Sequence, residues 1–303
     1  MKLTQQAQYR LAIAIAIFVV AVWGETFISS KILLDNGMAP AEIFFLRFLL
    51  AYIFMWMFRP KAKVWANSLK DELWMMLLGI TGGSLYFMVE NTALSLSTAS
   101  NVAIIVCSVP LVTAALAACF YKDERMNKTQ IIGSVIAFLG MVLVVFNGEV
   151  ILKLNPVGDL LAFGASLTWG IYSIVTRQVI NTYKITFITR KVFAYGLITI
   201  IPYFIFVQPF EFDLKRLTLP VILVNTIYLG MVASMLCFIV WNWALKKIGT
   251  VTTTNLLYCQ TFFTMLIANI FLGERITWMA VAGTIILTLG MILALNKNRS
   301  LDC

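Results

Sequence analysis

Long runs of apolar residues, separated by short polar breaks, follow one another along the whole chain. The run 99–121, for example, contains no charged residue, and a helix of about 20 residues crosses the roughly 30 Å of bilayer hydrocarbon. The runs show no apolar–polar alternation with a period of two, and open strands cannot span lipid. The pattern therefore predicts membrane-spanning helices at 11–34, 40–58, 73–94, 98–121, 129–147, 156–180, 185–207, 219–245, 250–272 and 276–296.

The composition of the chain supports this interpretation. Hydrophobic residues make up 61% of the 303 residues and charged residues only 12%, whereas about 25% of the residues are charged in an average soluble domain. A water-soluble fold could not hide this much apolar surface, because a compact body must still present a surface to water. We therefore predict an all-α membrane protein with ten transmembrane helices.

The basic residues between the predicted helices indicate the orientation of the chain. The net charge is +9, but most lysines and arginines lie in short loops, so membrane topology explains them better than nucleic-acid binding does. With the N-terminus in the cytoplasm, most of these residues are cytoplasmic, and only Lys153, Lys215, Arg216 and Arg275 lie outside. By the positive-inside rule, we expect both termini in the cytoplasm and the protein in the inner or plasma membrane.

The two halves of the chain share an ordered set of residues, with an offset that drifts by a few positions. The matched pairs include Trp23 and Trp169, Arg47 and Arg190, Asn91 and Asn242, Gly133 and Gly283, and Gly140 and Gly290. Each half, 11–147 and 156–296, holds five predicted helices. Because five is odd, the second half enters the membrane from the opposite side, which predicts an inverted repeat of the kind found in alternating-access transporters. The glycine spacing predicts close helix packing.

These repeated motifs resemble a known family. The residues that carry the likeness are Trp23-Gly24, Arg47 within Phe44–Phe48, the run Glu90-Asn91-Thr92-Ala93-Leu94, and its counterpart Trp241-Asn242-Trp243-Ala244-Leu245. Together they resemble the drug/metabolite transporter superfamily, and specifically its EamA branch, over nearly the whole chain. The resemblance implies ten helices, a central cavity and export of amino acids or other metabolites.

Three ionisable residues stand out inside the predicted helices, where a charge costs at least about 2.5–3.5 kcal/mol near the bilayer centre. Glu25, Arg47 and Glu90 fall in the first, second and third helices, and a rise of 1.5 Å per residue places all three in the outer half of the membrane. They are expected to line or gate a cavity for a charged substrate, or to form an ion pair that locks three helices together. Neither glutamate recurs in the second half, where Ile171 and Trp241 stand instead, and this favours a role in transport.

Aromatic and amide side chains accompany these charges. Trp23 and Trp169 lie near the bilayer midplane, too deep to serve as interfacial anchors, and Tyr86 lies one turn before Glu90 on the same helix face. Such residues either line a cavity or pack and hydrogen-bond between helices. The candidate substrate-binding residues are therefore Trp23, Glu25, Arg47, Tyr86, Glu90, Asn91, Trp169, Asn242 and Tyr258.

Some function classes are disfavoured by what the sequence lacks. It contains no histidine, which rules out a histidine-ligated metal, and we expect no metal or cofactor. The chain has no phosphate-binding motif of the G-x-x-x-x-G-K-[ST] type, so direct drive by ATP is disfavoured. The predicted helices hold neither a G-x-S-x-G motif nor paired aspartates, which disfavours a membrane-embedded enzyme.

We therefore expect a secondary transporter that exports amino acids or related small metabolites by alternating access, with the bilayer and a small molecule as its partners. The alternative is proton-coupled efflux of lipophilic or cationic compounds. Two carboxylates and one guanidinium leave an excess negative charge, which either a cationic group of the substrate or a proton would balance. Arg47, at a depth similar to that of the two glutamates, argues against a purely cationic substrate.

Overall fold

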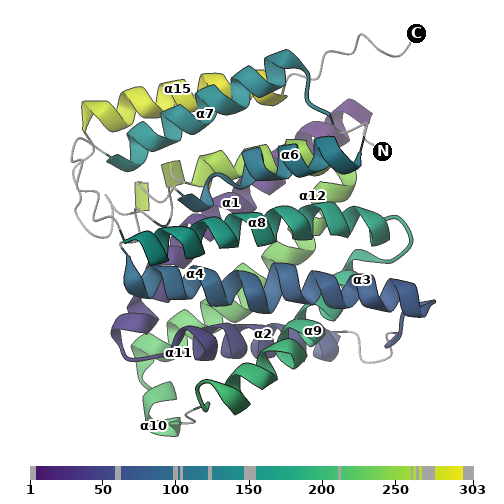
Figure 1. Ribbon diagram of the computed structural model, residues 1–303, viewed down its shortest axis with the longest axis vertical. Coiled ribbons are helices and arrows are strands. Elements are labelled where there is room, and N and C mark those ends of the chain that lie inside the picture. The colour runs from purple at the N-terminus through teal and green to yellow at the C-terminus, as the bar shows by residue number, and fades with distance from the viewer. Residues whose placement is uncertain are drawn as a thin grey trace.

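The computed structural model describes residues 5–58, 63–97, 102, 105–121, 125–146, 155–210, 213–260, 262–263, 266–267 and 277–295. Within these ranges all regular secondary structure is helical (Figure 1). The first half contains α1 (Gln5–Asp35), α2 (Pro40–Phe58), α3 (Leu69–Gly79), the π-helical segment η1 (Ile80–Ser84), α4 (Leu85–Leu96), α6 (Val109–Phe120) and α7 (Lys128–Phe146).

The second half is also helical throughout its regular secondary structure in the described residues. It contains α8 (Pro156–Val179), α9 (Ile185–Phe206), the short α10 (Leu214–Leu217), α11 (Pro220–Ile227), the π-helical segment η3 (Tyr228–Leu236), α12 (Cys237–Ile248), α13 (Thr250–Asn255), the 3-10 turn η4 (Leu256–Tyr258) and α15 (Trp278–Leu295).

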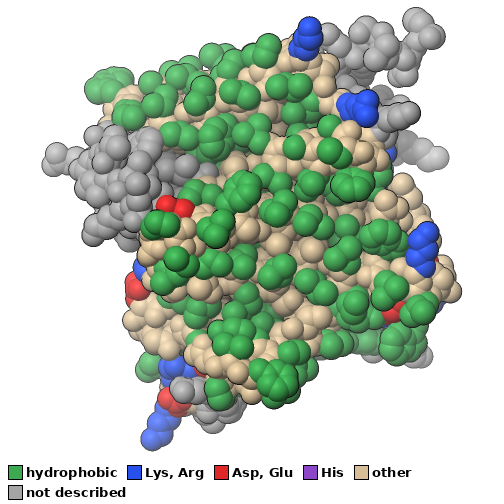
Figure 2. Space-filling view, in the orientation of Figure 1, with side chains coloured by type: hydrophobic (Ala, Val, Ile, Leu, Met, Phe, Trp, Pro, Cys, Tyr) green, Lys and Arg blue, Asp and Glu red, His purple; other side chains and the backbone are tan. Residues whose placement is uncertain are grey.

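The helices have the length and composition of membrane spans. Seven described segments are long and apolar enough to cross a bilayer, and Val109–Phe120 and Lys128–Val144 form shorter apolar helices. Side chains such as Phe18, Leu160 and Ile292 are more than half exposed, and Figure 2 shows hydrophobic side chains spread over the visible face with charged ones at its margins. The prediction of an all-helical membrane protein is thus confirmed for the described ranges. The helices predicted at 98–121 and 250–272 lie partly outside them.

Two predicted helices begin earlier in the structure than expected, and the first of them begins at Gln5 rather than at residue 11. The helix expected from residue 73 begins at Leu69, because the Oγ atom of Ser68 accepts a hydrogen bond of 3.1 Å from the backbone N–H of Asp71 and caps the first turn. Asp71 and Glu72 occupy that turn, where their negative charge is favourable near the N-terminus of a helix. A prediction based on apolar runs excludes such a polar first turn.

Contacts between the halves organise the core. Helix α1 packs against α12, and α4 packs against α8. The π-helical segment of each half packs against the second helix of the other half, η3 on α2 and η1 on α9. Glycine permits these approaches: a Cβ atom on Gly79 would lie 2.4 Å from the Cβ of Tyr195, and one on Gly230 would lie 2.8 Å from the Cβ of Leu50.

Helices α7 and α15 form a separate pair along one edge of the molecule (Figure 1). Their backbones meet at glycines. A Cβ atom on Gly140 would lie 2.3 Å from the backbone nitrogen of Leu287, and one on Gly290 would lie 2.3 Å from that of Ala137. The close packing that the glycine spacing predicts is therefore confirmed.

Candidate functional site

A small cavity lies at the centre of the helix bundle, with a volume of about 40 Å³. This volume has room for about three water molecules and is far below the roughly 300–1,000 Å³ of typical ligand pockets. In this conformation the cavity is therefore too small for a metabolite. The lining residues are Trp23, Thr26, Arg47, Tyr86, Phe87, Glu90, Val106, Cys107, Val109, Trp169, Phe238, Leu257 and Gln260.

Aromatic rings form much of the cavity wall. The rings of Trp23 and Trp169 meet edge to face, with centroids 5.4 Å apart and an interplanar angle of 89°. Tyr86 packs on Trp169 at 4.9 Å. The indole Nε1 of Trp23 donates a hydrogen bond of 2.9 Å to the carbonyl oxygen of Ala233, whereas the buried Nε1 of Trp169 has no partner among the described residues. The two corresponding tryptophans thus meet at the centre of the molecule.

Glu90 and Arg47 bring opposite charges into this aromatic surrounding. The hydroxyl of Tyr86 donates to Oε1 of Glu90 at 2.6 Å. The Nε of Arg47 donates to Oγ of Ser234 at 2.9 Å, and its guanidinium carbon lies 4.2 Å from the centroid of the Phe87 ring. Both side chains are buried and line the cavity. In the described part of the chain they form no direct ion pair with each other, so each retains bonding capacity for water or a ligand.

The remaining charged candidate, Glu25, does not line the cavity. Its Oε1 accepts a hydrogen bond of 2.7 Å from Ser29, and its buried Oε2 has no partner among the residues that the structure describes. The neighbouring Thr26 lines the cavity instead. The structure therefore brings together Arg47 and Glu90, and leaves Glu25 behind the wall.

The two asparagines also lie outside the lining. Asn242 is fully buried; its Oδ1 accepts from the hydroxyl of Tyr172 at 2.8 Å, and its Nδ2 donates to Oγ1 of Thr189 at 3.1 Å. These bonds tie α12 to α8 and α9. Asn91 donates from Nδ2 to the carbonyl oxygen of Pro40 at 3.3 Å. Both asparagines thus bond between helices in this conformation.

Tyr258 lies behind the cavity rather than in its wall. It is fully buried in a cluster with Cys107 and with Ala137, Met141 and Leu287 of α7 and α15. Cys107 lines the cavity on its other side, so Tyr258 backs a lining residue.

Several lining residues were not predicted, although the internal repeat contains the signal for them. The offset of 151 between Asn91 and Asn242 also relates Phe87 to Phe238, Val106 to Leu257, and Val109 to Gln260. All six of these residues line the cavity. Together with Trp23 and Trp169, the wall is built mainly from corresponding pairs. The two charged residues, Arg47 and Glu90, come from the first half alone.

A helical membrane protein with a central aromatic cavity and two opposed buried charges has the organisation of a small-molecule transporter. The model of the EamA-like transporter family matches this chain twice, at residues 10–146 and 156–296. The chain therefore belongs to the EamA-like transporter family, and it is a membrane transporter rather than an enzyme.

The chain is similar to several proteins named as transporters, and each match covers most of both chains. An uncharacterized transporter of Archaeoglobus fulgidus is 26% identical over 91% of this chain and 94% of its own. A probable amino-acid metabolite efflux pump of Escherichia coli is 24% identical over 91% of this chain and 92% of its own. A probable terminal-alkyne amino-acid exporter of Streptantibioticus cattleyicolor is 24% identical over 85% of this chain and 84% of its own.

A solved crystal structure has the same fold. It superposes with a TM-score of 0.73 at 15% sequence identity, and the match covers 93% of this chain and 96% of that one.

Proposed function

We propose that the protein is a secondary exporter of amino acids or related small metabolites, which works by alternating access between two inverted five-helix repeats, 11–147 and 156–296. The observation that carries the proposal is the central cavity, whose wall consists mainly of residue pairs related by the internal repeat. In inverted-repeat transporters the substrate binds where the two repeats meet.

The pattern of helix contacts supports an inverted arrangement. The contact of α1 with α12 corresponds to that of α8 with α4, and the contact of α2 with η3 corresponds to that of α9 with η1. In the edge pair, Gly133 approaches Gly290 while Gly140 approaches Gly283, so α7 and α15 are antiparallel. A two-fold axis perpendicular to these helices would lie in the membrane plane. Rotation about it would convert the contact of Gly133 with Gly290 into that of Gly283 with Gly140.

The two charges of the cavity suit a zwitterionic substrate. We expect Arg47 to bind its carboxylate and Glu90 to bind its ammonium group, because charge-assisted hydrogen bonds are the strongest that a desolvated site can offer. Nearby aromatic rings would pack on the side chain. Since about 40 Å³ is too small for an amino acid, the helices must separate to admit it. Two similar proteins, a probable terminal-alkyne amino-acid exporter and a probable amino-acid metabolite efflux pump, agree with this class.

A second candidate is proton-coupled efflux of lipophilic cations. Glu90 and the surrounding aromatic rings favour it, since aromatic faces attract cations. Arg47 in the same wall opposes it. Proteoliposomes with an imposed pH gradient should decide between the two, with amino acids and cationic dyes tested side by side. We expect saturable transport of at least one amino acid. Transport of the dyes alone would select the second candidate, and transport of neither would remove both.

We propose that the protein lies in the inner or plasma membrane. Both of its termini are then in the cytoplasm. Lys63 and Lys184 line one cavity at one end of the bundle, whereas Arg216 bonds to the carbonyl oxygen of Gly37 and to Glu42 at the other end. Among the described residues the first end also carries Lys246, as expected for the basic cytoplasmic side.

Cysteine labelling in intact cells would test this orientation. In a background with the native cysteines replaced by alanine, a membrane-impermeant maleimide added outside should label a Lys215→Cys variant and leave a Lys63→Cys variant unlabelled. Both should be labelled after permeabilisation, which controls for exposure. The opposite pattern in intact cells would overturn the orientation.

A further inference from the structure

We propose that a groove at the basic end of the bundle binds an anionic diacyl phospholipid, with its phosphate held by lysine and arginine side chains and its two acyl chains in adjoining apolar cavities. The site lies apart from the central cavity, and the inference does not depend on which metabolite is exported.

Two cavities on the side of the bundle supply the space. The first, of about 890 Å³, lies between the end of α2, the start of α9 and the junction of η3 with α12; its apolar wall includes Met55, Phe187 and Met235. The second, of about 650 Å³, lies on α12 with Ile15 and Trp243 in its wall. Both are lined by Lys184, Thr186 and Ile239. The cavities therefore adjoin at the start of α9, as two chains joined to one headgroup would require.

Positive charges gather at this junction. Lys63, Lys184 and Arg190 line the first cavity, and Lys246 lines the second together with Lys184. Arg190 is only 5% exposed; it donates to the backbone carbonyl of Lys63 and stacks over the ring of Trp56 at 4.4 Å. In the described part of the chain, no carboxylate pairs with Arg190 or Lys184. A buried guanidinium without a counter-charge is costly, and a phosphate would supply that charge.

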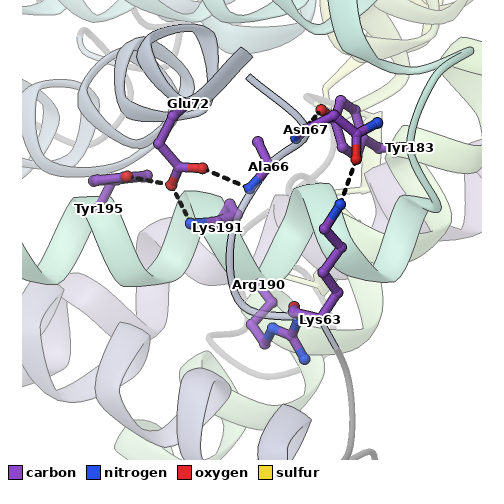
Figure 3. A network of polar contacts seen from close by, with 8 residues as sticks. All are labelled: Lys63, Ala66, Asn67, Glu72, Tyr183, Arg190, Lys191 and Tyr195. Carbon is purple, nitrogen blue, oxygen red and sulfur yellow. Dashed lines mark hydrogen bonds and ion pairs between the residues drawn. The ribbon is translucent and has the colours of Figure 1, made fainter. Parts of the chain in front are cut away.

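The acidic residues close to the groove are engaged elsewhere, as Figure 3 shows for Glu72. This carboxylate accepts hydrogen bonds from Lys191 and Tyr195, and from the backbone N–H of Ala66 at 2.7 Å. Asp71 accepts from the hydroxyl of Tyr183 at 2.7 Å. Burial and this bond to Asp71 raise the pKa of Tyr183, so the phenol stays a neutral donor. Neither acid is therefore available to neutralise Arg190.

The depth of the groove matches one leaflet of a bilayer. From Lys246 back to Met235 the chain descends roughly 16 Å at 1.5 Å per residue, about half of the 30 Å hydrocarbon thickness. Charged groups lie at the shallow end, and Met235, Leu236 and Ile239 lie at the deep end. Leu236 is 50% exposed and Phe58 is 73% exposed, so the groove is open to the surrounding lipid. A free phosphate ion would gain nothing from these apolar walls.

Native mass spectrometry of the purified full-length protein would test the site. The protein is titrated with dioleoyl phosphatidylglycerol or with dioleoyl phosphatidylcholine, which has the same chains and no net charge. We expect tighter binding of phosphatidylglycerol. A Lys184→Gln/Lys246→Gln variant should lose about five-fold in that affinity for each lysine, from the typical attraction of a basic residue to anionic lipid. A Lys215→Gln variant, changed at the opposite end, should bind like the wild type.

A second variant tests the apolar half of the site. Ile239→Trp places a larger side chain where the two cavities adjoin, and it should weaken the binding of both lipids. Equal binding of both lipids by the wild type, or an unchanged preference in the double lysine variant, would overturn the proposal. Displacement of phosphatidylglycerol by inorganic phosphate at comparable concentration would also overturn it, because the site would then recognise a soluble anion.

Discussion

Glu90→Gln should lower the initial rate of transport in proteoliposomes at least about ten-fold while the protein still folds. Glutamine retains the shape of the side chain and an oxygen that can accept the bond from Tyr86, whose hydroxyl lies 2.6 Å from Oε1. Only the charge is removed. The loss of one charge-assisted hydrogen bond in a desolvated site, roughly 1.5–3 kcal/mol, corresponds to a decrease of about ten-fold or more.

Glu25→Gln is the comparison variant for this experiment. In the wild type, the carboxylate of Glu25 lies outside the cavity wall and accepts a hydrogen bond from Ser29. We therefore expect this variant to lose less transport than Glu90→Gln. If a carboxylate carries a proton during the cycle, Glu90→Gln should also flatten the dependence of transport on pH. If Glu90 is only structural, the change should appear as a lower melting temperature in detergent. Wild-type transport and pH dependence in both variants would exclude a transport role for this cluster.

Gly140→Ala should cause a large loss of stability for a change of one methyl group. The added Cβ atom would lie 2.3 Å from the backbone nitrogen of Leu287 and 2.8 Å from the carbonyl oxygen of Gly283. Backbone atoms cannot move aside as a flexible side chain can, so α7 and α15 must separate. Overpacking of this kind costs about 1–3 kcal/mol or more, which should be visible as a lower melting temperature of the purified protein.

Gly164→Ala provides the matched control. Gly164 lies within helix α8, and no atom lies within 4 Å of a Cβ built on it. Because alanine is the better helix former by about 0.5–1 kcal/mol, this variant should be as stable as the wild type or more so. Equal melting temperatures for Gly140→Ala and Gly164→Ala would contradict the tight contact between α7 and α15.

The helical fold could be predicted from the sequence because the bilayer imposes a simple rule. Every buried backbone group in lipid must bond within its own helix, so a long apolar run has one stable structure. The rule does not extend to polar ends, and the first turn of α3, with Asp71 and Glu72, was missed for that reason. The rule also does not predict the π-helical segments Ile80–Ser84 and Tyr228–Leu236. These segments form where glycines allow the two halves of the chain to approach each other.

The candidate site could be predicted only in part, since a sequence gives the depth of a residue more readily than its direction. A rise of 1.5 Å per residue places Glu25, Arg47 and Glu90 at similar levels. A rotation of about 100° per residue then decides which of them face inward, and it depends on how the helices pack. Arg47 and Glu90 face the cavity, while Thr26 faces it in place of Glu25.

Corresponding residues of the two repeats are better guides to the cavity than single unusual residues. Phe87 and Phe238 carry no charge and resemble ordinary packing residues, yet both line the wall. In the proposed arrangement, an axis between the repeats passes between corresponding side chains, and those closest to it meet. Trp23 and Trp169, whose ring centroids lie 5.4 Å apart, are the clearest example.

The pairing of α7 with α15 also sets an order of events during synthesis. Helix α7 ends at Phe146, and its partner spans Trp278–Leu295, near the other end of the chain. At about 5–20 residues per second, the ribosome needs on the order of ten seconds to make the segment between them. During that interval Gly133 and Gly140 present a narrow, uncovered strip to the lipid or to other helices. The first half alone therefore carries a surface suited to self-association until α15 is inserted and covers it.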